Sequence, residues 1–542
     1  MSQMTAPLIL RARRVITMVP GSEPEAICVD GGRIEAVGSV SDLRDLHPKA
    51  EVRDLGESVI VPGFNDAHLH LLMTAEDLLH LDLSADSVRS LAELEALIRR
   101  EAAQQPAGTW IRGSRYDDAK LDGGRGVTRW DLDRMAPDHP VLVAHVAGHW
   151  GVVNSAALRL GGIDEATEEP PGGAFGRDVN GRLDGRLVEQ ALFDFAYPSV
   201  SRTGRTVAPA STDAERRSGL RRAVERFHAA GITSATDALV GADDVPFLAA
   251  AERDGDLTLR LNLLVSAETY DRFRARGRDV LRNSRLRLAG IKSFIDGAIG
   301  GRTCLMDEPF EGTSDDFGIQ TRTTAELRDT VRLAQEDGVP ACIHANGDRA
   351  IRTVLGLLAE AQEALPRPGL RHRLEHCSIV DEGILRRMHE LGAIAVPFGS
   401  YVHYHGARLL DWYGERRVRR MFAHRWFLDS GVLVAGSSDY PCGPFAPLLA
   451  MQSCVTRRGF DGAQLGVEQR ITAEEALALY TTSAAAATGE EGEKGVLAPG
   501  RRADFVVLGD DPLRHDPGSL SGIPVLETWV GGQRVWTAGA GQ

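Results

Sequence analysis

An apolar run that ends in two histidines constrains this chain more than any other feature. Residues 59–72, VIVPGFNDAHLHLL, place His68 and His70 one residue apart. Side chains alternate between the two faces of a strand, so both rings point to the same side. Two neutral imidazoles on a rigid strand supply half of the ligands that a metal such as zinc requires. A His-x-His pair also occurs in ordinary protein cores, so the metal interpretation depends on further ligands.

Later apolar runs end on more side chains that bind metals. The runs VPACIHANGD, RHRLEHCSIV and VLVAGSSDYP carry His344, His376 and Asp439, and LRLAGIKSFIDGAIGG carries Lys292. In barrels of alternating parallel strands and helices, functional side chains gather at the carboxyl ends of the strands. We therefore predict an α/β protein with a distorted (β/α)8 TIM barrel and these residues on its catalytic face.

The spacing of the strand-like runs divides the chain into regions. Nine runs look like strands, at 58–66, 141–146, 232–237, 258–265, 286–295, 339–345, 371–377, 393–397 and 432–438. A barrel needs eight strands. Because the regular spacing fails between 66 and 232, we assign the 141–146 run to an insertion after the first barrel strand, at residues 73–212.

Both ends of the chain consist of short strand-like runs broken by turns. Residues 1–57 and 491–542 are therefore predicted to build one small composite β-sandwich, which flanks a barrel at 58–490. Two unrelated β appendages are the alternative.

Composition and charge exclude several classes of partner. The 542 residues carry a formal net charge of −14, which disfavours nucleic acids and anionic membranes as partners. Apolar runs are too short for a membrane span or a signal peptide, which predicts a cytoplasmic protein. A homo-oligomer is possible. The six cysteines are scattered without a C-x-x-C pair, so neither a disulfide framework nor a thiolate zinc site is expected.

Longer motifs connect the chain to a known family. The order HLH, Lys, His, His, Asp, between VIVPGFNDAHLH and PGRRADFVVL, resembles the amidohydrolase superfamily. The segments AGHWGVVNSAAL, GITSATDA, IKSFIDGAIGGRT, IHANGDRAI, RLEHCSIV and AGSSDYP resemble amidohydrolase family 3 more narrowly, and the likeness spans nearly the whole chain. This resemblance implies a metal-dependent hydrolase on a distorted barrel with a composite β-sandwich. Thr236 stands in GITSATDA where many relatives have histidine, so that position receives no role.

Lysine usage makes Lys292 unusual. Of the 62 basic residues 58 are arginines, and the four lysines are Lys49, Lys120, Lys292 and Lys494. Arginine stays protonated in proteins, whereas a buried lysine can lose its proton. The neutral amine can react with carbon dioxide, and the resulting N6-carboxylated lysine can bridge two metals as a carboxylate does. The family resemblance implies the same modification. A buried ion pair with Asp296, or a side chain that extends toward solvent, is the alternative.

Other residues receive roles from their position. Asp439 is predicted to ligate a metal and act as general base, with helix capping as the alternative. Asp348 is a predicted N-cap. By strand alternation, Glu375 and Cys377 should point away from His376 and be structural, and His372 should pack in the core.

Several side chains outside the metal set are candidates for substrate contact. His149 and Asn154 occur in AGHWGVVN and Arg302 in GGRT, whereas Arg112 and Arg115 are weaker candidates. His403 and His405, in YVHYHG, form a rival His-x-His pair in a predicted loop. Because no apolar run would fix both rings, this pair is more consistent with lining a substrate pocket than with binding metal.

The sequence therefore predicts an amidohydrolase that cleaves the carbon-nitrogen bond of a small non-peptide amide. A metal-bound hydroxide is expected to attack the carbonyl carbon, and Asp439 to transfer the proton. One or two divalent ions, most simply Zn2+, are assigned to the ligands His68, His70, Lys292, His344, His376 and Asp439, with Lys292 shared between two metals. Ester, lactone or phosphoester hydrolysis, or decarboxylation, on the same site stays open. A catalytically inactive binding or regulatory barrel is the alternative of a different class.

Overall fold

A barrel of parallel strands forms the centre of the molecule. The computed structural model describes residues 7–122, 125–203, 205–276, 281 and 285–539. Seven parallel strands lie in the order β19-β18-β17-β16-β15-β14-β7. They are β7 (Phe64–Leu69), β14 (Ile232–Val240), β15 (Arg260–Ser266), β16 (Leu286–Phe294), β17 (Ala341–Ala345), β18 (Arg373–His376) and β19 (Ile394–Val396).

An eighth segment, residues 433–439, closes the barrel without forming a regular strand. It makes isolated parallel bridges with Ala395 of β19 and with Phe398, just beyond the end of that strand. On its other side, Ala67 N donates to Gly436 O, and Asp439 N donates to His68 O. The predicted distorted barrel is therefore confirmed, and residues 433–439 take the eighth position.

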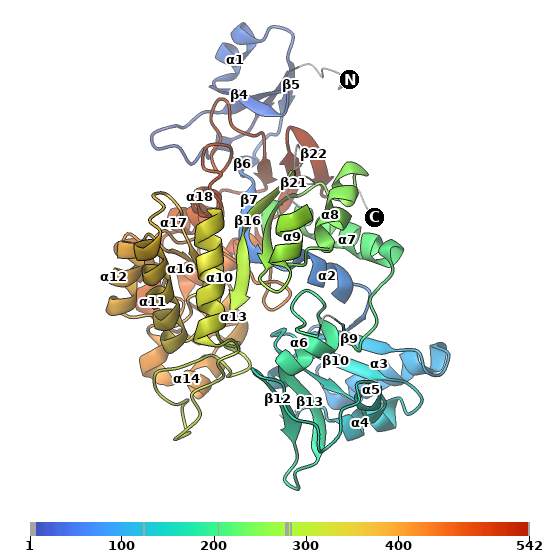
Figure 1. The fold of residues 1–542 in the computed structure, drawn as a ribbon. Helices are drawn as coiled ribbons and strands as arrows, with labels where there is room; N and C mark the ends of the chain where they lie inside the picture. Colours follow the sequence, from blue (N-terminus) through green and yellow to red (C-terminus); the bar gives the residue numbers. More distant parts are fainter. Residues whose placement is uncertain (1–6, 123–124, 204, 277–280, 282–284, 540–542) are drawn as a thin grey trace.

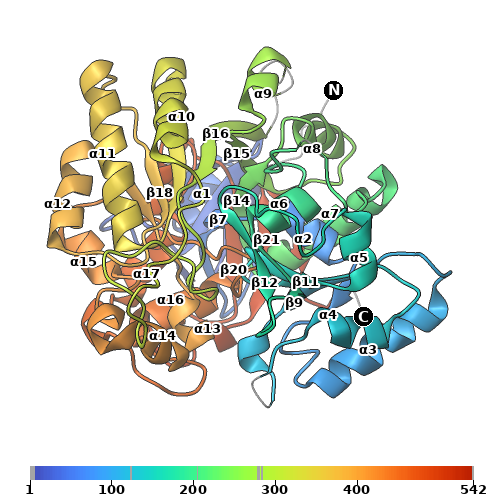
Figure 2. The same cartoon turned by 60° about the horizontal axis from the view of Figure 1, so that its bottom comes forward.

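Helices cover the outside of the barrel. Figures 1 and 2 both show α10 (Thr324–Asp337), α11 (Asp348–Ala364) and α12 (Glu382–Leu391) side by side on one flank. Local sequence sets the ends of α10, because Thr323 and Glu326 form a capping box and Gly338 ends the helix with a left-handed backbone. The remaining helices of this region are α2 (Leu71–Asp77), α7 (Asp213–Ala229), α8 (Asp244–Arg253), α9 (Tyr270–Arg276), α13 (Tyr401–His405), α14 (Arg408–Val418), α15 (His424–Asp429), α16 (Pro447–Thr456), α17 (Ala473–Leu479) and α18 (Thr482–Ala487).

A second sheet lies between α2 and α7 in the chain. Its six strands have the order β12-β13-β11-β10-β9-β8. They are β8 (Leu81–Asp82), β9 (Ile111–Tyr116), β10 (Val141–His145), β11 (Trp150–Val153), β12 (Gly173–Arg177) and β13 (Leu183–Glu189), accompanied by α3 (Leu91–Gln104), α4 (Arg129–Met135), α5 (Ser155–Leu160) and α6 (Gln190–Ala196). The 141–146 run thus lies in the inserted sheet as β10, outside the barrel. Figure 1 shows this insertion below α2 and α7.

The two ends of the chain share one sheet. β2 and β6 from the N-terminal part and β20, β21 and β22 from the C-terminal part form one sheet in the order β2-β6-β20-β21-β22, in which β6 pairs with β20. A second sheet has the order β4-β3-β1-β5. The strands are β1 (Leu8–Arg11), β2 (Arg14–Val15), β3 (Ala26–Asp30), β4 (Arg33–Gly38), β5 (Glu51–Asp54), β6 (Val59–Pro62), β20 (Phe505–Leu508), β21 (Val525–Val530) and β22 (Gln533–Thr537), with helix α1 (Val40–Leu46). The composite β-sandwich is therefore present.

One predicted strand, 58–66, is wrong because the structure divides it. Its first part is β6, which pairs antiparallel with β20 in the composite sheet, and its second part is β7 of the barrel. Gly63 separates the two, and a Cβ atom there would lie 2.2 Å from Thr233 Oγ1. Any larger residue at this point would therefore clash with the Thr233 side chain. No helix in the described part of the chain is long and apolar enough to cross a membrane.

Candidate active site

A small cavity lies at the carboxyl ends of the barrel strands. Its volume is about 30 Å³, and its lining includes His70, His149, Lys292, His344, His376 and Asp439. Phe193 and Phe294 contribute apolar wall. The fold thus brings five of the six predicted metal ligands, and one predicted substrate contact, to a single small cavity.

His68, His70 and Asp439 form the tightest group of potential ligands. Asp439 Oδ1 lies 3.3 Å from His68 Nε2 and 3.1 Å from His70 Nε2. The ligand atoms of the three residues all lie within 4.8 Å of one another, and all three side chains are buried. Two imidazoles and a carboxylate in this arrangement suit a divalent transition metal.

The protonation states of this group also fit a metal. Burial lowers the pKa of His70 to about 4 and lowers that of His376 well below its usual value. Burial alone would raise the pKa of Asp439, but the neighbouring His376, His68 and His70 hold it well below its usual range. Neutral imidazoles beside an ionised carboxylate are the forms that coordinate metals.

Buried atoms without partners provide a further test. His68 Nε2, His70 Nδ1, His376 Nδ1 and Lys292 Nζ have no hydrogen-bond partner among the described residues. Buried polar groups are normally paired, so several orphaned donor atoms around one cavity indicate a missing ligand. The residues present therefore fit a bound divalent metal.

Glu375 lies beside this group, contrary to the expectation from strand alternation. Its Oε2 contacts His68 Nδ1, and Arg373 holds both of its oxygens at 2.8 and 2.9 Å. The alternation fails because His376 and Cys377 have φ angles of 77° and 42°, which turn His376 toward the same cavity. The sequence did contain a signal, because Arg373 and Glu375 put two charges on one face of a fully buried strand.

Lys292 Nζ ends in the cavity wall on β16. Burial lowers its pKa, although Glu375 and Asp439 oppose the effect. The alternative ion pair with Asp296 is not formed within the described residues, because Asp296 accepts hydrogen bonds from the backbone of Leu305, Asn346 and Gly347. The lysine is therefore a buried amine facing potential metal ligands.

His344 and His376 lie close to each other, and His376 also lies close to the compact group. Their ring centroids are 4.5 Å apart, and the ring of His376 lies 4.7 Å from that of His68. His344 Nε2 is 3.1 Å from Gly297 O and 3.0 Å from Asn346 Nδ2. Both rings line the same cavity, where they flank the His68, His70 and Asp439 group.

His149 reaches the cavity from the insertion. Its Nδ1 lies 2.7 Å from Glu189 Oε2, and Thr303 Oγ1 donates to Glu189 Oε1 at 2.8 Å. Burial would lower the pKa of His149, but the charge of Glu189 raises it above its usual value. Glu189, which the sequence did not single out, therefore orients His149 and favours its protonated form.

The structure places two predicted substrate contacts, Asn154 and His403, outside the lining of the small cavity. The Asn154 amide caps α5 through Ala157 N and also bonds Val141 N and His139 O, so the residue is structural. His403 and His405 lie on α13 instead of in a loop, and residues two apart on a helix face different directions. His403 consequently lines a separate surface pocket with Gln452 and Phe460.

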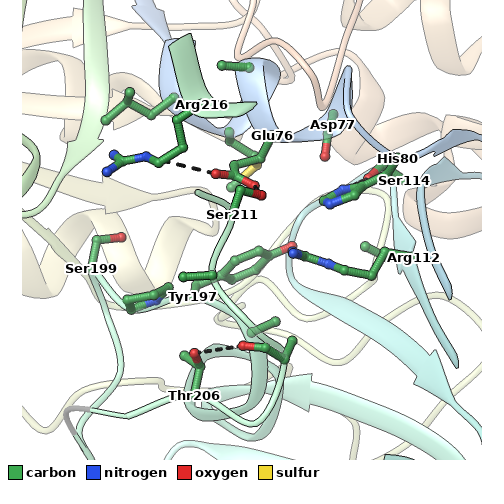
Figure 3. A pocket seen from close by; sticks show the side chains of 18 of the residues that line it. Glu76, Asp77, His80, Arg112, Ser114, Tyr197, Ser199, Thr206, Ser211 and Arg216 are labelled. Carbon is green, nitrogen blue, oxygen red and sulfur yellow. Dashed lines mark hydrogen bonds and ion pairs between the residues drawn. The ribbon is translucent and has the colours of Figure 1, made fainter. Parts of the chain in front are cut away.

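Two larger cavities adjoin the small one. The first, about 330 Å³ in volume, shares His70, Met73, Tyr197 and Leu239 with it (Figure 3). The second, about 370 Å³, shares Ala147 and Cys442 and contains the predicted contacts Arg302 and His405. We call them the apolar chamber and the polar chamber. Arg112 lies in the apolar chamber.

A second group of possible ligands lines the polar chamber. Asp117, Asp118 and His145 bring their ligand atoms within 4.8 Å of one another. These atoms already have protein partners, because Tyr404 donates to Asp117, His145 Nε2 lies 3.3 Å from Asp118, and His145 Nδ1 accepts from Ala147 N. This group is therefore held together without an ion.

Comparison with known sequences identifies the family. A sequence profile described as the Amidohydrolase family matches residues 51–536. The chain belongs to the amidohydrolase family. A second profile, the bacterial imidazolonepropionase-like composite domain, matches residues 26–50. The family prediction, and with it the prediction of a metal-dependent hydrolase, is confirmed.

Related sequences and a solved structure match this amidohydrolase over nearly its whole length. A putative amidohydrolase YtcJ of Bacillus subtilis is 32% identical, covering 95% of this chain and 96% of its own. An N-substituted formamide deformylase of Arthrobacter pascens is also 32% identical, over 98% of each chain. An uncharacterized metal-dependent hydrolase from Pyrococcus furiosus has a TM-score of 0.71 and 25% identity, covering 94% of this chain and 100% of that one.

Proposed function

We propose that this amidohydrolase hydrolyses secondary amides that combine a small acyl group with a bulky amine. The observation that carries the proposal is the contrast in size between the cavities. About 30 Å³ beside His68, His70 and Asp439 holds a group of only a few atoms. The apolar chamber, about 330 Å³ and sharing His70, has room for a much larger substituent. The 32% identical relative named N-substituted formamide deformylase supports the same class of substrate.

Side chains around the small cavity have the donor set for one or two divalent ions, of which Zn2+ suits the ligands best. His68, His70, Asp439 and a carboxylated Lys292 would hold the first, and Lys292, His344 and His376 a second. A bound ion there would acidify a water molecule and polarise the amide carbonyl. Glu375 supports this arrangement because it fixes the ring of His68 through Nδ1.

The chain's own residues then move the proton. Water adds its oxygen to the carbonyl carbon, and the ionised Asp439 accepts the proton that the water loses. As the carbon-nitrogen bond breaks, Asp439 returns this proton to the nitrogen, which leaves as an amine together with a carboxylic acid. His149, held by Glu189, donates a hydrogen bond toward the carbonyl oxygen. Phe193 and Phe294 keep bulk water out of the cavity.

Acyl-chain selectivity tests this function. We expect kcat/KM to fall steeply from the formyl to the acetyl to the benzoyl amide of 2-phenylethylamine, because a benzoyl group exceeds the small cavity. Phe193→Ala, which removes one wall, should raise the acetyl rate relative to the formyl rate. Phe195→Ala is the matched control, because Phe195 lies on the same helix α6 but packs in the core of the insertion.

Equal rates for formyl and benzoyl amides would refute the size argument. Hydrolysis of esters, lactones or phosphoesters, with no amide turned over, would instead support the alternative chemistries on the same site.

A further inference from the structure

The apolar chamber lies where the insertion meets the barrel, and its lining includes His70. Figure 3 shows its polar side chains. Its barrel side includes Leu72, Met73 and Leu239, and its insertion side includes Leu142, Tyr197 and Pro209. Ligand pockets commonly form at such junctions, with mostly apolar walls and a few polar groups that fix orientation. The polar groups of this chamber therefore indicate which charged or polar group a substrate has at the end that enters the chamber.

Most charged groups of the chamber already have protein partners. Arg216 donates to Asp244 at 2.6 Å and lies 4.0 Å from Glu76, and Glu76 also accepts from Ser211. Asp243 pairs with Arg272 at 2.8 Å. These carboxylates are committed to the wall of the chamber and do not need a ligand.

Arg112 is different. Its Nη1 donates to Pro209 O at 3.1 Å, but its buried Nε has no hydrogen-bond partner and the side chain forms no ion pair within the described residues. Burial lowers the pKa of Arg112, whereas the charges of Glu76 and Asp77 raise it, although neither carboxylate forms an ion pair with the guanidinium. Figure 3 shows Arg112 reaching into the chamber beside Tyr197 and His80.

We propose that Arg112 binds an anionic group, most simply a carboxylate, at the end of the substrate's amine arm. An unpaired cation in a largely apolar cavity is unfavourable, and a ligand anion removes that penalty. The flat guanidinium suits a carboxylate because it can donate two parallel hydrogen bonds. The substrate class is then a small-acyl amide whose apolar arm ends in an acid. This inference rests on the proposed function, since it places the amine arm in the apolar chamber.

The polar chamber is a weaker candidate for the same group. Arg302 and Arg186 line it, but Asp117 and Asp118 line it as well. Arg186 lies over the ring of Trp150 at 4.8 Å, and its charge lowers the pKa of Asp118. Arg186 therefore already faces a carboxylate of the protein, whereas Arg302, whose buried Nε also has no hydrogen-bond partner among the described residues, lies over the ring of Phe310 at 5.4 Å.

A matched pair of substrates tests the inference. We expect the metal-loaded enzyme to prefer N-formyl-4-(aminomethyl)benzoate over its primary carboxamide by about ten- to a hundredfold in kcat/KM, the range of a charge-assisted hydrogen bond. Arg112→Gln should bring this ratio close to one, and Arg112→Lys should retain part of it. Arg99→Gln is the charge-matched control, because Arg99 is exposed on α3 of the same insertion and pairs with Glu95.

Binding of inert analogues separates this inference from the proposed function. Calorimetry with the N-methylsulfonyl derivatives of the same acid and carboxamide reads the preference without turnover. Hydrolysis of both amides at equal rates, or a preference that survives Arg112→Gln, would overturn the role of Arg112 alone. Loss of the preference in Arg302→Gln instead would place the anion in the polar chamber and likewise refute the inference. Preferred binding of the acid, with neither amide hydrolysed, would refute the proposed function but support the anion site.

Discussion

The proposed chemistry requires a covalent modification of Lys292. Its side chain is fully buried, its Nζ has no hydrogen-bond partner among the described residues, and it lies over the ring of Phe294 at 4.8 Å. An ammonium in these surroundings is poorly stabilised, which favours the neutral amine that reacts with carbon dioxide. Carboxylation would replace the unpaired amine of Lys292 with a negatively charged carbamate that can bind a metal ion.

Substitution of Lys292 distinguishes this proposal from a plain structural lysine. Lys292→Arg should lose at least one metal equivalent and most activity, because a guanidinium cannot form the carbamate and brings a positive charge toward the ions. Lys292→Ala should regain part of its activity with added acetate or propionate. Elemental analysis together with kcat measures both effects. A Lys292→Arg enzyme with full activity and all its metal would contradict the bridging role while leaving the His68, His70 and Asp439 site intact.

His372 gives a prediction about pH. It packs in the core as expected, where its Nδ1 accepts from Ala341 N at 2.9 Å and its Nε2 contacts Gln335 at 2.8 Å. Burial lowers its pKa to about 4. Between that value and an unfolded pKa near 6.5, the unfolded chain binds a proton that the folded chain does not. The contribution of His372 to the free energy of unfolding is therefore fully present above pH 6.5. Between pH 6.5 and about 4 it falls by about 1.4 kcal/mol for each unit of decreasing pH.

His372→Asn removes this titration but keeps a side-chain acceptor for Ala341 N. The variant should be less stable than the wild type at pH 8, and the difference in Tm should shrink as the pH falls toward 5. Parallel Tm profiles for the two proteins over this range would show that His372 does not titrate with unfolding.

At the scale of elements, the junction between β6 and β7 joins two sheets through one residue. Sequence reasoning found the apolar run but read it as a single strand, because both halves are equally apolar and fully buried. Periodicity cannot show that one half pairs with β20 and the other with β14. The pairing of each half and the close approach of Gly63 to Thr233 show the division, and these contacts join distant parts of the sequence.

Gly63→Ala should destabilise the protein by about 1–3 kcal/mol through overpacking, because the new methyl group would meet the Thr233 side chain. Gly63→Ala combined with Thr233→Gly should recover part of the loss. Gly38→Ala provides the control, since a Cβ atom at Gly38 meets nothing within 4 Å. Thermal unfolding of the three variants measures the difference, and equal effects of Gly63→Ala and Gly38→Ala would contradict the steric account.

At the scale of the molecule, the repeated strand ends with metal-binding residues could be predicted from the sequence. Contacts and cavities that form only between distant segments could not. Strands that end on His344, His376 and Asp439 predicted the barrel and its catalytic face, because strand ends carry local signals. Glu375 and Glu189 escaped prediction because their roles depend on backbone turns at His376 and at Glu189 itself, where φ is 77° and 51°. The unequal cavities, which indicate the substrate, arise between the insertion and the barrel and leave no local pattern.

Metal dependence of catalysis tests the central claim most directly. The purified enzyme should be stripped with a chelator and then titrated with Zn2+ while the metal content and the hydrolysis of the formyl amide of 2-phenylethylamine are followed. We expect the stripped enzyme to be inactive, and activity to return in proportion to bound metal up to one or two equivalents per chain. His70→Ala should bind less metal and regain little activity. Full activity in protein shown by elemental analysis to contain no metal would contradict the account.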